Sequence, residues 1–263
     1  MPSIYYQNWE SFIANWFAGN SLGPWTDPRT APQLLNDIAN SVNSFEYIPE
    51  PWWGNHDFGI PLHSVVINFN PGKAGNLQLR SNVPYKTSYA TDIVDSNYLP
   101  QTKQWHQNRR ALPILNALKN IGALPPNFAP SIEHHLSIEL IPWHTENIGA
   151  KCGFFPYLKQ NIKNVYEHSI CFAANESRRI ANKKLKNVVI LKLSKTNTQK
   201  LIKLLNGIGC VCSIKQQQTI NGNSHCLEFS INSLPGIRFC SIWGSISRNY
   251  FPKDLDVILR NCI

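Results

Sequence analysis

The stretch VVINFNPGKAG, residues 65–75, has the composition of a buried β-strand that ends abruptly at Asn70-Pro71-Gly72. Asn, Pro and Gly each favour turns, so an ordinary β-turn is one explanation for the end of the strand. The alternative is that the strand delivers the Asn70 side chain into a cleft at the carboxyl edge of a sheet, where open α/β sheets bind ligands. The rest of the chain is needed to choose between these two interpretations.

Strands and helices alternate along the chain. Besides the strand at residues 64–69, apolar runs predict strands at residues 136–141, 188–193 and 237–242. Periodic apolar residues predict helices at residues 103–122, with Pro113 marking a kink or a start, and at residues 155–185. A further helix is expected to open with the capping box Thr196-x-x-Gln199 and to end at Gly207.

This order of elements predicts the fold class. Strands joined by helices form mostly parallel sheets with helices on both faces. We therefore expect a single α/β domain of three layers, α/β/α, around a four-stranded mostly parallel sheet. A helical N-terminal extension (residues 1–48) would precede the α/β core (residues 49–263), and a β-hairpin turning at Asn221-Gly222 would be inserted before the last strand.

Composition excludes several classes of protein. The 263 residues are 43% hydrophobic and 16% charged, which is enough apolar material for a globular core. The sequence contains no apolar run of ~18 residues, so we expect no membrane helix. The first residues do not resemble a secretory signal. The seven cysteines lack the C-x-x-C spacing of metal sites, so we expect buried, reduced thiols, a cytoplasmic location and neither metal nor cofactor.

The charge of the chain is strongly asymmetric. Residues 1–150 hold 8 Lys+Arg and 11 Asp+Glu, a balance of −3, whereas residues 151–263 hold 17 and 5, a balance of +12. Arg178 and Arg179 begin the densest basic cluster. A solvated basic face is one explanation, but an asymmetry of this size is typical of proteins that bind a polyanion, and nucleic acid is the commonest one.

Three strand ends carry a resemblance to the uracil-DNA glycosylase superfamily. INFNPG resembles its first motif, which reads G-[IM]-N-P-G in the mismatch-specific and single-strand-selective branches. HHLSIELIP resembles the strand that reads the pyrimidine edge, where H-N-Y-C-P is typical. SIWGSISRN resembles the leucine-loop motif H-P-S-P-R-N, which wedges into the duplex. The similarity covers residues 50–250 in outline, and only the first motif is close.

The resemblance implies roles for the residues of the first motif. Asn70 would orient the water that attacks the sugar, because an amide positions a nucleophile without abstracting its proton. Phe69 and Gly72 of the same motif would contact the substrate. The target base must also be flipped out of the duplex, which explains a need for a basic surface and a wedge.

The departures from the family pattern concern the base. Glu139 stands where the family has its pyrimidine-reading asparagine. An ionised glutamate only accepts hydrogen bonds and suits the N4 amino group of cytosine, whereas a protonated one could donate to cytosine N3. Both states favour a cytosine-type base over uracil. A shift of the strand by one residue, with Glu139 facing a surface helix, is the structural alternative.

The remaining candidate residues follow from the same comparison. Trp243 replaces the leucine-loop histidine, so His144, in the loop after the second strand, would take over the catalytic contact with the base. Tyr85 would stack on the flipped base. The expected DNA contacts are Trp243, Ser245, Ser247, Arg248, Arg178 and Arg179.

The sequence thus predicts a DNA glycosylase that acts on a modified cytosine in duplex DNA and leaves an abasic site. It resembles phage-defence glycosylases of this superfamily, which remove glucosylated hydroxymethylcytosine from phage DNA. The alternatives are a uracil or mismatch repair glycosylase, an inactive DNA-binding module of the same fold, and a nucleosidase. A nucleosidase would not need the basic half of the chain.

Overall fold

The computed structural model describes residues 3–22, 25, 47–69, 75–95, 100–144, 154–221, 224–243 and 255–262. These residues form two compact units. Unit 1 comprises Met1–Trp52, Phe69–Pro100 and Glu139–Ser169, and unit 2 comprises Trp53–Asn68, Gln101–Ile138 and Ile170–Ile263. The predicted division into residues 1–48 and 49–263 follows the order of the chain, whereas each unit interleaves three separate segments.

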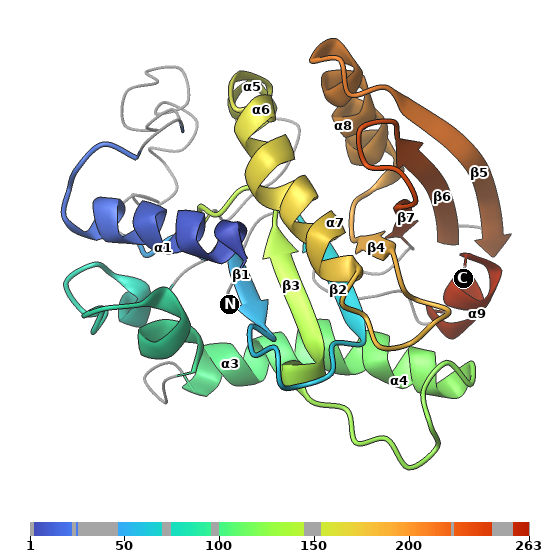
Figure 1. Ribbon diagram of the computed structural model, residues 1–263, viewed down its shortest axis with the longest axis horizontal. Helices are drawn as coiled ribbons and strands as arrows, with labels where there is room; N and C mark the ends of the chain where they lie inside the picture. Colours follow the sequence, from blue (N-terminus) through green and yellow to red (C-terminus); the bar gives the residue numbers. More distant parts are fainter. Residues whose placement is uncertain are drawn as a thin grey trace. The chain divides into compact units, whose positions relative to one another are not determined.

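The described residues form a seven-stranded sheet in the order β1-β3-β2-β4-β7-β6-β5 (Figure 1). The strands are β1 Trp52–Gly54, β2 Ser64–Asn68, β3 His135–Glu139, β4 Val188–Leu191, β5 Cys212–Asn221, β6 Ser224–Ile231 and β7 Arg238–Trp243. The four strands predicted as the sheet are the contiguous block β3-β2-β4-β7. The expected four-stranded sheet is nevertheless too small, because β1 extends it on one side and the hairpin β5–β6 on the other.

The central block is parallel. β2 pairs in parallel with β4, and β4 with β7. Hydrogen bonds from His63 N to His134 O (2.9 Å) and from Ile141 N to Phe69 O (3.1 Å) run in the same sense along β2 and β3, which indicates a third parallel pair. β2, β3 and β4 are buried along their whole length, which is typical of strands covered on both faces.

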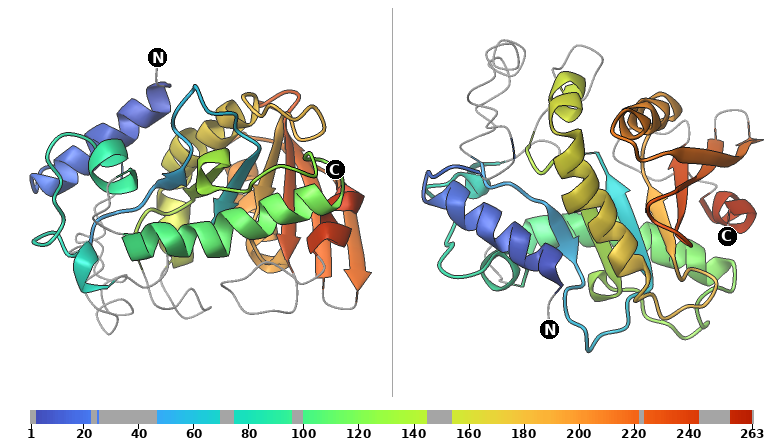
Figure 2. Two further views of the ribbon diagram at one scale, coloured as in Figure 1. Left: turned by 90° about the horizontal axis from the view of Figure 1, so that it is seen from below. Right: turned by 45° about the horizontal axis from the view of Figure 1, so that its top comes forward.

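Helices cover both faces of the sheet within unit 2 (Figure 2). They are α4 Leu112–Asn120, α7 Cys171–Ser177, α8 Lys195–Gly207 and α9 Leu255–Cys262. α7 packs on β2 and β4, α8 on β5 and β7, and α9 on β6 and α4. α8 and α9 take opposite faces, because Thr198 of α8 bonds to Ser241, whereas α9 reaches Cys226, which lies opposite Ile242 across the β6–β7 pair.

Strand β1 was not predicted, because its flanking prolines and Trp52-Trp53-Gly54 look like a turn. Asn55 N donates to His135 O (2.8 Å) and Glu139 N to Pro51 O (2.9 Å), so this short segment runs antiparallel to β3. Gly54 has φ +106°, and a Cβ there would lie 2.0 Å from the His135 carbonyl oxygen. Only glycine permits this close approach.

Pro113 interrupts a long helix, as predicted. α3 (Pro100–His106) passes through a π-helical turn, η4 (Gln107–Ala111), into α4, with Pro113 in the first turn of α4. Proline has no N–H and its ring clashes with the carbonyl four residues earlier, so the hydrogen-bond ladder widens just before it.

The other elements differ from the prediction in detail. α8 begins at Lys195, and its N-cap is Ser194, whose hydroxyl accepts from Asn197 N (3.2 Å); the predicted Thr196 capping box is wrong. The predicted hairpin is confirmed as β5–β6, with Asn221 opposite Ser224. The helix predicted for residues 155–185 ends earlier, at Ser177, because a turn of ten residues precedes β4.

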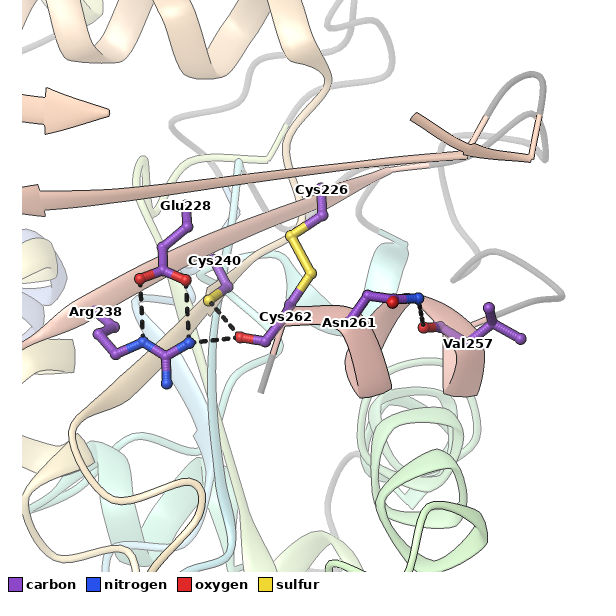
Figure 3. The surroundings of a disulfide bond; sticks show 7 residues. All are labelled: Cys226, Glu228, Arg238, Cys240, Val257, Asn261 and Cys262. Carbon is purple, nitrogen blue, oxygen red and sulfur yellow. Dashed lines mark hydrogen bonds and ion pairs between the residues drawn. A yellow bond between two sulfur atoms is a disulfide. The ribbon is translucent and has the colours of Figure 1, made fainter. Parts of the chain in front are cut away.

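The cysteines are not all free thiols, contrary to expectation. A disulfide joins Cys226 of β6 to Cys262 at the end of α9, 36 residues apart in sequence (Figure 3). Cys171, Cys210, Cys212 and Cys240 are not joined in disulfides. Beside the disulfide, Arg238 donates two hydrogen bonds to Glu228 (3.1 and 3.0 Å) and one to the Cys262 carbonyl (2.6 Å), so the last turn of α9 is attached to the sheet at several points (Figure 3).

Unit 1 consists largely of the segments that follow the carboxyl ends of β2 and β3 along the chain. Its helices are α1 Ile4–Phe17, η2 Asn76–Gln78, η3 Ala90–Val94, α5 Phe154–Gln160, α6 Ile162–Asn164 and most of η6 Val165–Ile170. α1 buries one face, made of Tyr6, Trp9, Phe12, Ile13 and Trp16, at helical spacing. No helix in the described parts of the chain is long and apolar enough to cross a membrane.

Candidate functional site

The strand order identifies one edge of the sheet as the expected ligand site. From β2 the chain moves to β3 on one side and then to β4 on the other, so the order reverses between β2 and β4. Open α/β sheets bind ligands outside the carboxyl ends of the strands at such a reversal. Asn70 follows the last residue of β2, Asn68, by two positions in sequence, although it lies outside the described residues.

A buried polar network closes the carboxyl end of β2 in unit 2. Asn68 is 1% exposed, and its Nδ2 donates to Ser137 Oγ of β3 (2.7 Å). Its Oδ1 accepts a short hydrogen bond from Arg110, which comes from the π-helical turn η4 and is itself buried. The Arg110 guanidinium also lies over the Trp105 ring, 5.1 Å from its centroid. Buried amides and hydroxyls require such partners, so this network fixes the end of β2.

A second polar pair lies at the amino end of the same strands. Ser64 Oγ of β2 lies 2.8 Å from His135 Nδ1 of β3, and both residues are buried. Burial, together with the charges of Arg110 and His106, lowers the pKa of His135 to about 3, so its imidazole is neutral at physiological pH. β2 and β3 therefore share a face with one hydrogen-bonded polar pair near each end.

Glu139 is the last residue of β3 and belongs to unit 1. It is 1% exposed, its N–H donates to Pro51 O (2.9 Å), and its carbonyl oxygen accepts from Ser169 Oγ (3.1 Å). Residues 135, 137 and 139 alternate along the strand and so share one face. Glu139 is therefore a buried carboxylate on the same face of β3 as His135 and Ser137.

A second buried carboxylate, Glu50, organises the other polar side chains of unit 1. It is 1% exposed and accepts a short hydrogen bond from Gln78 Nε2. Gln78 Oε1 in turn accepts from Gly75 N (2.8 Å). Gly75 is the first described residue after Asn70-Pro71-Gly72, and Gln78 connects it to Glu50.

His144 is the third member of this cluster. Its Nε2 lies 3.4 Å from Glu50 Oε1, and its ring meets the edge of Tyr47 at a centroid distance of 6.3 Å. The side chain is only 3% exposed, so His144 is not an ordinary solvated loop histidine. When His144 is protonated, this contact is an ion pair.

Besides burial, both buried carboxylates of unit 1, Glu50 and Glu139, raise the pKa of Tyr89. Its pKa is raised well above the usual value by complete burial and then by the charges of Glu50, Glu10 and Glu139. Its hydroxyl donates to Trp52 O (3.0 Å). Both carboxylates therefore lie near enough to Tyr89 to influence its pKa.

Tyr85 and Phe69, both predicted to bind the substrate, pack against aromatic side chains of unit 1. Tyr85 is partly exposed and stacks on Phe17, with a centroid distance of 5.1 Å and an interplanar angle of 26°. Burial and the charges of Glu10 and Asp92 raise the pKa of Tyr85 to about 12, so its hydroxyl stays protonated. Phe69 is buried and packs near Phe155 at 5.9 Å.

The remaining predicted residues divide into three groups. Asn70, Gly72, Ser245, Ser247 and Arg248 lie outside the described residues. Trp243 is the last residue of β7 and partly exposed, at the carboxyl edge of the parallel block. Arg178 and Arg179 lie elsewhere: they follow α7 and precede the start of β4, at the amino edge of the block.

Arg179, predicted to contact DNA, makes an ion pair and a hydrogen bond within unit 2. Its Nε lies 2.9 Å from Glu176 Oε2, and one terminal nitrogen donates to Asn55 Oδ1 (2.7 Å). The guanidinium also covers the Phe58 ring at 4.1 Å. These contacts compensate its charge within unit 2, so it is a structural residue in the first place.

Sequence reasoning missed Glu50, Gln78, Arg110, Asn68 and Ser137. Two signals were present. Glu50 is the only charged residue in the run Ile48-Pro-Glu-Pro-Trp-Trp, which is otherwise apolar. In HLSIE, polar residues alternate with apolar ones inside a strand whose neighbours are apolar. Gln78 and Arg110 gave no local signal, because their partners are far away in sequence.

No family model matches the chain, and neither a curated protein nor a solved structure matches it. Within the described residues, no group of three or more His, Cys, Asp or Glu side chains could hold a metal ion.

Proposed function

We propose that the chain is a DNA glycosylase that hydrolyses the N-glycosidic bond of a modified cytosine, with glucosylated hydroxymethylcytosine in phage DNA as the intended base. The observation that carries the proposal is a buried carboxylate, Glu139, at the carboxyl end of the strand next to β2. The strand order makes this edge the expected ligand site. The Asn70-Pro71-Gly72 motif directly follows β2 in sequence.

In the proposed reaction a water oxygen bonds to the sugar C1′ while the bond from C1′ to the base nitrogen breaks. The bonding electron pair leaves with the base, and the water proton ends on that base, directly or through solvent. Asn70 orients the water by hydrogen bonding. The products are a free base and an abasic sugar with a hydroxyl group at C1′.

Glu139 would select the base. If ionised, it accepts from the N4 amino group of cytosine and repels the O4 of uracil. If protonated, it donates to cytosine N3 and improves the leaving group. His144, held by Glu50 at 3.4 Å, would offset the negative charge that develops on the O2 of the departing pyrimidine.

Trp243 and the segment with Ser245, Ser247 and Arg248 would enter the duplex and occupy the space that the flipped base vacates. Trp243 is the last residue of β7, so the segment follows the carboxyl edge of the parallel block in sequence. Tryptophan can stack on the neighbouring base pair, which would offset part of the cost of unstacking.

The substitution Asn70→Ala tests the proposal. We expect excision from a duplex containing glucosylated hydroxymethylcytosine, measured in single turnover, to fall by ~100-fold or more, because the water loses its positioning group. Binding of the same duplex should change little, since Asn70 holds water and not phosphate. The matched control is Asn76→Ala, at an exposed position in the same β2–β3 connection.

An Asn70→Ala protein that excises the base at the wild-type rate would contradict the assignment. Loss of binding without a further loss of single-turnover rate would make Asn70 a DNA contact and not a catalytic residue.

A further inference from the structure

The turn between α7 and β4, residues 178–187 (RRIANKKLKN), carries five cations and no acidic residue. We call it the basic turn. Arg179 is paired with Glu176, but Arg178, Lys183, Lys184 and Lys186 are exposed. Four positive charges therefore face solvent from ten consecutive residues.

The backbone of the basic turn is fixed by hydrogen bonds. Asn187 N donates to Ser177 O (3.0 Å) and closes the turn, and Ala181 N donates to Leu62 O (2.9 Å). Asn182 is its centre: its carbonyl oxygen accepts from the N–H groups of Leu185 (3.1 Å) and Lys186 (2.9 Å). Its side chain accepts from Lys184 N (2.8 Å) and donates to the Ala123 carbonyl.

Two apolar side chains hold the basic turn against unit 2. Ile180 and Leu185 are 3% and 1% exposed. The exposed cations alternate with these buried apolar side chains, so the lysines project from an ordered backbone. Binding to an ordered turn loses less backbone entropy than binding to a flexible basic segment.

The basic turn lies at the amino edge of the parallel block, opposite the carboxyl ends of β2 and β4. It leads into the first residue of β4, and Ala181 is bonded to Leu62, two residues before β2 begins. In the sequence, the Asn70 motif follows the carboxyl end of β2. A strand of four residues spans roughly 13 Å, so one phosphate cannot touch both edges.

We propose that the basic turn is a second, sequence-independent DNA-binding surface, which holds the phosphate backbone of a duplex segment other than the one presented for base excision. The turn has four exposed cations and no acidic residue to compensate them. It therefore favours a ligand with closely spaced negative charges, such as the phosphodiester backbone of DNA. The proposal does not rest on glycosylase activity, because unmodified DNA is the ligand.

The test compares two variants of the whole protein with equal loss of charge. The first replaces Arg178, Lys183, Lys184 and Lys186 by Gln. The control replaces Arg260, Lys200, Lys203 and Lys215 by Gln, which are one arginine and three lysines at exposed positions outside the basic turn. Binding of a short unmodified duplex is measured by fluorescence anisotropy over a range of salt concentrations, and thermal unfolding confirms that both variants are folded.

We expect the slope of log affinity against log salt to fall by roughly 2–4 for the basic-turn variant and by less than about 1 for the control. A third variant with Lys183, Lys184 and Lys186 changed to Arg should keep the wild-type slope. Equal losses in the first two variants would mean a diffuse charge effect and would overturn the proposal. A wild-type slope in the basic-turn variant would also overturn it. If binding of polyglutamate, measured in the same way, is lost in that variant while DNA binding stays intact, the turn binds an acidic polypeptide and the proposal is wrong.

Discussion

At the scale of single residues, Glu139 is costly to bury. An ionised carboxylate loses its hydration in a strand that is closed to solvent along its length, and proteins tolerate this only with compensation or with a change of protonation. Besides burial, both Glu50 and Glu139 raise the pKa of Tyr89. Unit 1 therefore buries two carboxylates in a region where apolar side chains would cost less desolvation free energy. A binding or catalytic role is a physical reason for that cost.

The substitution Glu139→Gln should therefore change selectivity more than stability. Excision of a cytosine-type base should fall by ~10-fold to over 100-fold, because a mismatched polar group costs ~1–3 kcal/mol. The matched control is Glu176→Gln, also a fully buried carboxylate, whose partner Arg179 is structural. The control should lower the melting temperature and leave the ratio of excision rates between bases unchanged. If both variants behave alike in base selectivity, Glu139 belongs to the structure and not to the site.

Single residues were predictable where the signal was local. Glu139 and His144 stand at or after a strand end in the sequence, and both are buried in the structure. Glu50, Gln78 and Arg110 were not predicted, since their contacts join residues that are 28 to 94 positions apart. No pattern within a short window encodes such pairings.

At the scale of elements, β2 is held by a polar hydrogen bond near each end. Ser64 pairs with His135 at the amino end, and Ser137 with Asn68 at the carboxyl end, from which the Asn70 segment departs. Both serines are buried, and both bonds join β2 to β3. This symmetry offers a controlled comparison of the two ends of one strand.

The substitutions Ser64→Ala and Ser137→Ala should each destabilise the protein by ~1–3 kcal/mol, because each leaves a buried partner unsatisfied. If the proposed function is right, only Ser137→Ala should also lower kcat, by about 10-fold with KM little changed, since Asn68 lies at the strand end that precedes the proposed catalytic residue Asn70. Denaturant unfolding and steady-state excision measure the two effects. An equal loss of kcat in both variants would show that the polar network supports the fold alone.

Elements were predictable where composition and periodicity agreed. The four strands of the parallel block, the hairpin and the interruption at Pro113 were all visible in the sequence. β1 was not, because proline and glycine around two tryptophans indicate a turn, and its strand geometry exists only through pairing with β3. The cap of α8 was misplaced by two residues, since Ser194 and Thr196 are chemically equivalent caps and only the backbone of Ser194 is extended.

At the scale of the whole molecule, topology is what the sequence could not supply. The order β3-β2-β4-β7 depends on which side of β2 each later strand joins, and that choice is made by tertiary packing. The Cys226–Cys262 disulfide was missed for the same reason, because the 35 intervening residues carry no sign that α9 returns to β6. The charge asymmetry was visible, but its densest part lies at the amino edge of the parallel block, opposite the carboxyl ends of β2 and β4.

The most direct measurement is incubation of the wild-type protein with matched duplexes that carry one cytosine, 5-hydroxymethylcytosine, glucosylated 5-hydroxymethylcytosine or uracil, followed by alkali to cleave at abasic sites. We predict cleavage at the glucosylated base, little at unmodified cytosine or uracil, and none at any base with Asn70→Ala protein. Preference for uracil, or intact strands in every duplex, would contradict the account.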